Sequence, residues 1–169
     1  MQEKIKPKHW RRWFNIWDSP NIFCLVLCFV EAKIERFMGG STFFFVKSKT
    51  FEFSVGEGGT IYSLRIIEKG WDSSCFVTLG KESAKRLLFN MEELASKQSP
   101  VQFSRTFKEG NKIFIIQLGS NARENFLLVS ELIHGRRRGS IVIPEGKLAK
   151  GWGVIGLHLR KTLEDSLLQ

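Results

Sequence analysis

Three consecutive arginines, Arg136 to Arg138, form the densest cluster of positive charge in this sequence. They stand between Gly135 and Gly139, and a short glycine-flanked segment of this kind is typical of a turn between two strands. A guanidinium group makes forked hydrogen bonds to phosphate, and such contacts contribute affinity without reading a base sequence. The pattern therefore predicts a basic hairpin turn that contacts an anionic partner. A turn that is simply solvated is the alternative.

The residue types that catalysis or metal binding requires do not form a recognisable pattern. The three histidines are scattered and match no spacing of metal ligands. No Ser-His-Asp, Cys-His or paired-carboxylate arrangement can be placed at convergent positions. The cysteines cannot all pair, and each is expected to be a small buried side chain in a reducing compartment: Cys24, Cys28 and Cys75. We therefore expect a binding protein rather than an enzyme, with no metal, cofactor or small-molecule substrate.

The bulk composition favours a folded domain with an anionic partner. The chain has 169 residues, which suggests one domain or one domain built from two similar halves. Its apolar fraction of 43%, with 15 Phe and 5 Trp, is sufficient for a core. The 26 basic and 17 acidic residues give a net charge of +9. This balance favours nucleic acid or an acidic membrane surface, and charge that serves solubility alone is the alternative.

The N-terminal segment, residues 1–40, differs in composition from the rest of the chain. Residues 1–20 are basic and rich in Trp, and the apolar run Ile22–Val30 follows. A run of nine apolar residues is too short to span a bilayer, which needs about 20. No small-residue cleavage site of a signal peptide follows it. We expect residues 1–40 to be an N-terminal extension, either a targeting segment or an added piece, on an intracellular protein for which the nucleus is favoured over an organelle.

From about Ser41 the apolar residues follow the pattern of strands, and a helix comes after them. Strands are expected at Phe43–Val46, Phe51–Val55, Ile61–Ile67 and Cys75–Leu79. Helical spacing then extends over Lys81–Lys97. The second half repeats this order, with strands and a final helix at Val101–Phe107, Ile113–Leu118, Phe126–Leu132, Ile141–Ile143 and about Leu148–Leu168.

The two halves align as an internal repeat. Lys49–Val55 in the first half matches Lys112–Leu118 in the second, and this alignment defines the repeat offset. A repeat of this length usually means two supersecondary units that share one core, because each is too small to bury its own sheet face. The sequence therefore predicts an α+β fold of two antiparallel sheet-plus-helix units, ββββα twice. The units span about residues 41–98 and 101–168 within one domain, 41–169.

The second unit resembles a PUR repeat at the level of individual residues. Asn111-Lys112-Ile113-Phe114, an aliphatic strand, Asn121 and then Arg123-Glu124-Asn125-Phe126-Leu127 follow the order of that family's pattern. The doubled strand and helix order is similar to the fold shared by PUR and Whirly proteins and a related transcriptional coactivator. The chain also resembles a plant retroelement-associated domain of unknown function, at Lys47–Glu52, Pro144–Gly146 and Gly151-Trp152. Together these resemblances cover about residues 42–165.

The resemblance to PUR repeats implies that the sheets bind single-stranded nucleic acid. It implies contacts to nucleotides from Asn121 and Phe126, and more loosely from Lys49 and Lys112. The sequence departs from the family at Gly119, where lysine is usual, and at Glu124-Asn125, which replace Gly-Arg. A carboxylate beside the expected phosphate track would weaken binding.

We therefore expect a single-stranded DNA- or RNA-binding protein of low sequence specificity, with a role related to transcription. The basic track would consist of Lys47, Lys49, Lys112, Arg123, Arg136, Arg137 and Arg138. The candidate stacking platforms beside it are Tyr62, Trp71 and Phe126, although a Phe in a strand more often packs in the core. The alternative is a retroelement-derived protein–protein interaction module whose nucleic-acid binding is weak or lost. A homo-oligomer is compatible with both. A third, weaker alternative is a membrane-attached protein that uses Ile22–Val30 as its anchor.

Overall fold

The computed structural model describes residues 35–36, 41–47, 49–56, 61–96, 102–147 and 150–166. The apolar run 22–30 lies outside these residues, as do Cys24 and Cys28. Among the helices in the described ranges, none has both the length and the apolar character needed to cross a membrane. The interpretation of residues 1–40 as an extension, and the domain boundaries that go with it, stay predictions.

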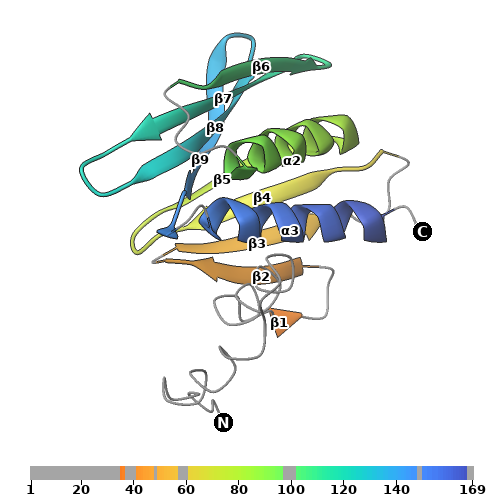
Figure 1. The fold of residues 1–169 in the computed structure, drawn as a ribbon. Helices are drawn as coiled ribbons and strands as arrows, with labels where there is room; N and C mark the ends of the chain where they lie inside the picture. Colours follow the sequence, from red (N-terminus) through yellow and green to blue (C-terminus); the bar gives the residue numbers. More distant parts are fainter. Residues whose placement is uncertain are drawn as a thin grey trace.

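In the described part of the chain the strands form two antiparallel sheets, and a helix follows each sheet along the sequence (Figure 1). Sheet 1 consists of β1 (Glu35–Arg36), β2 (Ser41–Val46), β3 (Lys49–Val55), β4 (Leu64–Lys69) and β5 (Ser74–Leu79), and is followed by α2 (Lys81–Ser96). Sheet 2 consists of β6 (Ser104–Glu109), β7 (Lys112–Ser120), β8 (Asn125–Ile133) and β9 (Arg136–Pro144), and is followed by α3 (Lys150–Asp165). The predicted ββββα order, twice, is confirmed, and β1 adds a short edge strand.

The two units bury the same positions of the repeat. Phe51 and Phe53 of β3 correspond to Phe114 and Ile116 of β7, and all four side chains are at most 1% exposed. Alternate residues of a strand point to one face, so these positions turn one face of each sheet to the core. We call this the inner face of each sheet and the opposite one the outer face. The same repeat offset relates further buried pairs: Leu64 to Leu127 and Ile66 to Val129.

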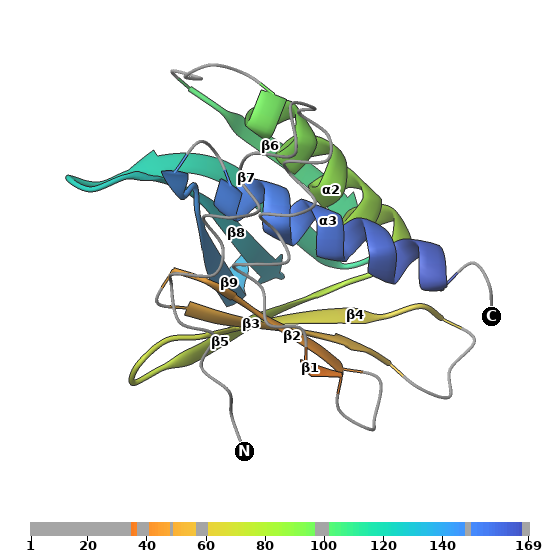
Figure 2. The same cartoon turned by 60° about the horizontal axis from the view of Figure 1, so that its bottom comes forward.

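Each helix contacts the sheet of the other unit, so the two units share one core. At the start of α2, the carboxylate of Glu109 in β6 accepts hydrogen bonds from the backbone N–H of Gly80 at 2.9 and 3.0 Å. An acidic group at a helix N-terminus satisfies N–H groups that have no partner within the helix. On α3, the ring of His158 stacks on Phe44 of β2 with centroids 4.3 Å apart. Figure 2 shows α2 and α3 side by side on one side of sheet 1, with no described helix on its other side.

The three arginines begin strand β9 and do not form the turn before it, which corrects the expectation from the sequence. The chain reverses at His134 and Gly135, whose φ angles are 51° and 74°. Positive φ at both central residues is typical of a tight two-residue hairpin. The turn is therefore complete before Arg136, and Arg137 pairs with Leu132 of β8 in the ladder.

The expected burial of Cys75 is wrong, because its side chain is exposed. Cys75 does alternate with the buried residues Val77 and Leu79 of β5. However, Ser74 to Phe76 are all exposed, so the first half of this strand extends beyond the core. Alternation identifies the face of a strand but not the point at which the core ends.

Matching Lys–Glu pairs join the two sheets where edge strand β5 of sheet 1 meets edge strand β9 of sheet 2. In the first pair, Glu131 of β8 binds Lys112 Nζ at 3.0 Å, and the Glu131 side chain is only 3% exposed. Glu131 also accepts a hydrogen bond from the backbone N–H of Thr78 in β5 at 2.9 Å. Lys112 in turn donates to the carbonyl oxygen of Thr78 at 3.0 Å. One ion pair of sheet 2 thus satisfies both backbone groups of a residue in sheet 1.

Lys49 and Glu68 repeat this arrangement with the roles of the sheets exchanged, so that an ion pair of sheet 1 binds the backbone of a residue in sheet 2. By the repeat offset, Lys49 is the counterpart of Lys112 and Glu68 is the counterpart of Glu131. Glu68 binds Lys49 and accepts a hydrogen bond from the backbone N–H of Val142 in β9 at 2.5 Å. Lys49 donates to the carbonyl oxygen of Val142 at 3.4 Å. We call the two arrangements the reciprocal clamps, since each unit holds the edge strand of the other.

His158 is a buried titratable group on the inner side of α3. Its side chain is 4% exposed, and its Nε2 has no hydrogen-bond partner among the described residues. Burial lowers the pKa of His158 from 6.5 to about 4, and the nearby positive charge of Lys161 contributes to this lowering. The imidazole is therefore neutral in the folded protein at neutral pH.

We expect Glu131→Ala to destabilise the fold by about 3–5 kcal/mol, because it leaves Lys112 and the N–H of Thr78 without their partner in a buried setting. Glu92→Ala is the matched control: its pair with Arg160 joins side chains that are 45% and 50% exposed. Such a pair contributes about 0–1 kcal/mol. Urea unfolding of both variants measures the two losses. Equal losses would contradict the role assigned to the clamp.

The low pKa of His158 predicts a loss of stability in acid. The unfolded chain binds a proton on this residue below pH 6.5, whereas the folded chain does so only below about 4. Stability from this group is therefore complete above pH 6.5 and falls as the pH decreases to about 4, by about 3 kcal/mol in total. Urea unfolding between these pH values should show a smaller acid loss for His158→Phe than for the wild type. Equal acid losses in the two proteins would contradict the role assigned to His158.

Candidate nucleic-acid interface

The three lysines of the expected basic track all contact carboxylates. Lys49 and Lys112 belong to the reciprocal clamps and bind Glu68 and Glu131. Lys47, which follows β2, binds Glu124 of the loop between β7 and β8. The structure therefore places these lysines at contacts between the two units, where their charges are balanced.

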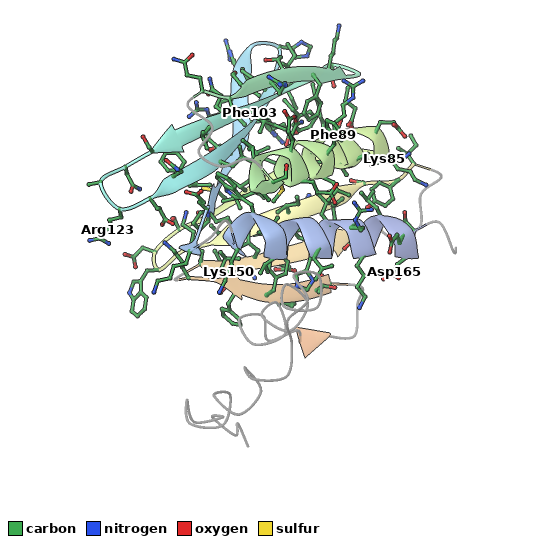
Figure 3. All side chains as sticks on the ribbon, in the orientation of Figure 1. Lys85, Phe89, Phe103, Arg123, Lys150 and Asp165 are labelled. Atoms are coloured by element: carbon green, nitrogen blue, oxygen red, sulfur yellow. The ribbon has the colours of Figure 1, made fainter. Side chains whose placement is uncertain are left out.

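Asn121 and Arg123 lie in the β7–β8 loop and have different roles there. The side-chain oxygen of Asn121 accepts hydrogen bonds from the backbone N–H groups of Arg123 and Glu124, at 2.9 and 3.0 Å. This is the way in which asparagine commonly holds a turn. The side chain of Arg123 is exposed and projects from the end of the loop (Figure 3). The loop thus offers a single positive charge outward, and the carboxylate of Glu124 is directed to Lys47.

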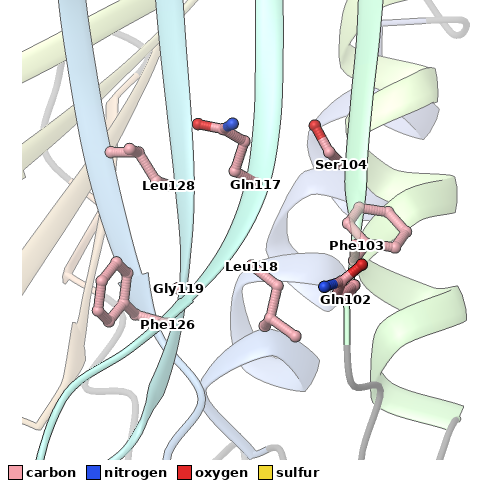
Figure 4. A pocket seen from close by; sticks show the side chains of 8 residues that line it. All are labelled: Gln102, Phe103, Ser104, Gln117, Leu118, Gly119, Phe126 and Leu128. Carbon is pink, nitrogen blue, oxygen red and sulfur yellow. The ribbon is translucent and has the colours of Figure 1, made fainter.

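Phe126 lies on the outer face of sheet 2 and packs over Gly119, its partner in the β7–β8 ladder. A Cβ atom at residue 119 would collide with the Phe126 ring, so glycine is required beneath it. A hollow of about 570 Å³ opens beside this pair (Figure 4). Its lining consists of Gln102, Phe103, Ser104, Gln117, Leu118, Gly119, Phe126 and Leu128.

The two other candidate stacking residues differ sharply in exposure. Tyr62 packs against the core, and its hydroxyl is buried without a hydrogen-bond partner among the described residues. Burial raises the pKa of the Tyr62 phenol. Trp71, in the hairpin between β4 and β5, is 98% exposed. Of this pair, Trp71 presents its whole ring to solvent, whereas Tyr62 is half-buried.

The arginines at the start of β9 lie next to sheet 1. Gly139 approaches the carbonyl oxygen of Phe76 in β5 so closely that a Cβ atom would collide with it. This contact brings Arg138, the preceding residue, beside the β5 edge. Arg136 to Arg138 are all exposed, and within the described residues none of them pairs with a carboxylate. The three charges therefore remain available beside sheet 1.

The outer face of sheet 1 combines exposed aromatic rings with cations. Phe43 and Phe45 of β2 alternate with the buried residues Phe44 and Val46, so they point outward. Phe45 is 44% exposed. The β2–β3–β4–β5 ladders place Phe43, Glu52, Ile67 and Phe76 in one row across these four strands.

Two cations of β4 lie over these rings. The guanidinium carbon of Arg65 is 4.9 Å from the ring centroid of Phe76, which is 38% exposed. Lys69 Nζ is 5.1 Å from the ring centroid of Phe43 and 2.7 Å from Glu52, whose charge it balances. We call this surface the cationic-aromatic face. It consists of Phe43, Phe45, Arg65, Lys69 and Phe76.

Reasoning from the sequence did not single out the residues of the cationic-aromatic face. Alternation along 43–46 already indicates that Phe43 and Phe45 share a face. The combination with Arg65 and Phe76 depends on the register of four strands, which a single sequence does not fix. The structure brings the start of β9, with Arg138, next to the β5 edge of sheet 1, and it leaves Asn121, Arg123 and Phe126 at the end of sheet 2 where β7 meets β8.

No protein-family model matches the sequence, and no curated protein matches it. Among solved structures, the chain is similar to that of the plant transcriptional regulator PBF-2, with 12% sequence identity and a TM-score of 0.34. The match covers 76% of this chain and 81% of that one. A TM-score of this size is too low to establish a common fold.

Proposed function

We propose that this protein binds single-stranded nucleic acid with low sequence specificity, through the outer face of sheet 1. It acts as a binding module and not as an enzyme. The observation that carries this proposal is the cationic-aromatic face, on which exposed phenylalanine rings stand beside cations. Surfaces that bind single strands combine these two elements, because bases stack on rings while phosphates follow the positive charge.

Aromatic stacking supplies the preference for single strands. Phe45 and Phe76 are 44% and 38% exposed, and their rings lie on a sheet face that no described helix covers. A base contributes about 1–3 kcal/mol when it stacks on such a ring, whatever its identity. A duplex hides the faces of its bases, so it cannot use these rings.

The positive charge beside the rings supplies affinity for the backbone. Arg65 lies on the face itself, whereas Glu52 balances the charge of Lys69. The contact of Gly139 with Phe76 brings the preceding Arg138 beside the β5 edge, and Arg136 and Arg137 come just before it. Phosphate contacts of this kind do not read sequence, which accounts for the expected low specificity. The lysines of the reciprocal clamps add little, because Glu68 and Glu131 already balance them.

We expect Phe45→Ala to weaken binding of a labelled oligonucleotide by about 5- to 150-fold, which corresponds to the loss of one stacked base. Replacing Arg136, Arg137 and Arg138 by Ser should reduce the slope of log K against log salt by about 2, since each lost phosphate contact removes about 0.7. Fluorescence anisotropy across a salt series measures both quantities.

The controls are variants of the same kind placed elsewhere. Phe89→Ala removes a ring that is 67% exposed on α2, and it should leave the affinity unchanged. Replacing Lys85, Lys108 and Lys161 by Ser removes as many exposed charges away from the face, and it should change the salt slope little. If the wild type binds no oligonucleotide at low salt, or if Phe45→Ala and Phe89→Ala act equally, the proposal is refuted.

A protein–protein interaction module is the second candidate. Its support is that Lys47, Lys49 and Lys112 bind carboxylates, so the basic track expected from the sequence has lost much of its free charge. Reversing the charge of Arg136 to Arg138 separates the two candidates. A nucleic-acid-binding protein loses its affinity for oligonucleotides, whereas an interaction module keeps its partners.

A further inference from the structure

Strand β6 leaves one edge of sheet 2 open. It is the first strand in the order β6-β7-β8-β9, and within the described residues no strand pairs with its other side (Figure 1). Just before β6, the carbonyl oxygen of Phe103 accepts a hydrogen bond from the N–H of Leu118 at 2.9 Å. Bonded and unbonded pairs alternate along an antiparallel ladder, so every second residue from Phe103 bonds to β7. Thr106 and Lys108 therefore direct their backbone N–H and C=O groups to the open edge.

The corresponding edge of sheet 1 is covered by a strand. By the repeat offset, β2 is the counterpart of β6, and Phe43 is the counterpart of Thr106. Phe43 pairs with Glu35 of β1, which runs antiparallel to β2. The repeated unit can thus carry an added strand at this edge, whereas the described part of the chain supplies none to β6. An open strand edge is a template for pairing with another chain.

Helix α2 places an exposed ring beside the open edge. The guanidinium carbon of Arg86 lies 5.9 Å from the ring centroid of Phe107 in β6, and Glu93 lies 3.9 Å from Arg105 of the same strand. Residues three and four apart share one face of a helix, so Phe89 stands between Arg86 and Glu93 on the face turned to β6. Its side chain is 67% exposed and is labelled in Figure 3. The edge and the helix together form a place where a strand can add.

Unpaired positive charge lies on both sides of the open edge. Lys108 of β6 and Arg86 of α2 are exposed, and among the described residues neither forms an ion pair. Glu109, the acidic residue of β6, is directed away from the edge, because its carboxylate binds the N–H of Gly80. The net charge of the chain is +9. These charges favour an acidic partner, and they oppose a second copy of this chain.

We propose that the open edge of β6 binds an extended, acidic segment of another protein as an added strand. The main chain of that segment bonds to Thr106 and Lys108, which gives affinity, and its alternate side chains give specificity. Acidic side chains meet Lys108 on the outer face, and apolar side chains meet Phe89 on the opposite side. A nucleic-acid strand has no alternating N–H and C=O groups with which to continue the ladder. The inference does not rest on the proposed function, because β6 and the cationic-aromatic face belong to different sheets.

The test uses a labelled peptide of about eight residues, a common strand length, in which glutamate and valine alternate. The control peptide alternates lysine and valine. Fluorescence anisotropy with the full chain should show binding of the acidic peptide, weakened by salt, and no binding of the basic one. Hydrogen exchange locates the contact: the amides of Thr106 and Lys108 should become protected when the acidic peptide binds. Those of Arg105 and Phe107 are protected already by their bonds to β7.

Thr106→Pro is the sharpest variant. It removes an N–H from the open edge and keeps the bonds of Arg105 and Phe107 to β7, and proline is tolerated on edge strands. It should raise the dissociation constant of the acidic peptide about tenfold or more and leave the circular dichroism spectrum unchanged. Phe89→Ala, which removes the ring, should weaken binding to a similar extent. Phe45→Ala, on the other sheet, should leave peptide binding intact.

Three results overturn the proposal. One is that the acidic peptide does not bind up to about 1 mM, where even a weak contact of about 4 kcal/mol is detected. The others are equal binding of the two peptides and unchanged binding in both Thr106→Pro and Phe89→Ala. None of these bears on oligonucleotide binding, which Phe45→Ala weakens and Phe89→Ala does not. The peptide site and the proposed function therefore succeed or fail separately.

Discussion

The arrangement of this fold depends on the reciprocal clamps, because the two sheets meet at edge strands that belong to different ladders. β5 ends the ladder of sheet 1 and β9 ends the ladder of sheet 2. Backbone groups at such a junction need partners, since an unpaired buried N–H or C=O is costly. Glu131 and Lys112 supply them for Thr78, and Glu68 and Lys49 supply them for Val142. The sheets can therefore meet at an angle and enclose both helices without forming one continuous sheet.

The repeat explains why the clamps come as a pair and why the outer faces differ. Both units contribute to one shared core, and each binds the edge strand of the other at the β5–β9 junction. The buried residues of the inner face and the Lys–Glu pair therefore occur in both units. The outer faces carry neither of these constraints. The clearest difference between the outer faces is that Arg65 and Lys69 of sheet 1 stand at the positions that Leu128 and Leu132 occupy in sheet 2. One architecture thus carries two surfaces of opposite chemistry.

The sequence was sufficient to predict the strands, the helices and the repeat, but it predicted less of the binding surface. Strand and helix periodicity depends on local alternation, and it identified both ββββα units. Whether the positive charge of a lysine or arginine stays unpaired depends on which carboxylate the fold brings near it. Lys112 finds Glu131 only because β7 and β8 pair in one register. The turn at His134-Gly135 was similarly missed, because a left-handed histidine is not a common turn signal.

The structure explains the two positions at which the sequence departs from the PUR pattern, at Gly119 and at Glu124. Gly119 is required beneath the Phe126 ring, and Glu124 joins Lys47 of the other unit while also accepting from the N–H of Gly146 at 3.4 Å. Both residues therefore serve the packing of the β7–β8 end. Lys49 and Lys112 pair with Glu68 and Glu131 and lose their free charge, whereas none of the three arginines that follow the hairpin turn pairs with a carboxylate among the described residues. Unpaired positive charge thus gathers at the start of β9, next to the β5 edge of sheet 1, and this position favours the cationic-aromatic face over the loop that the family pattern indicated.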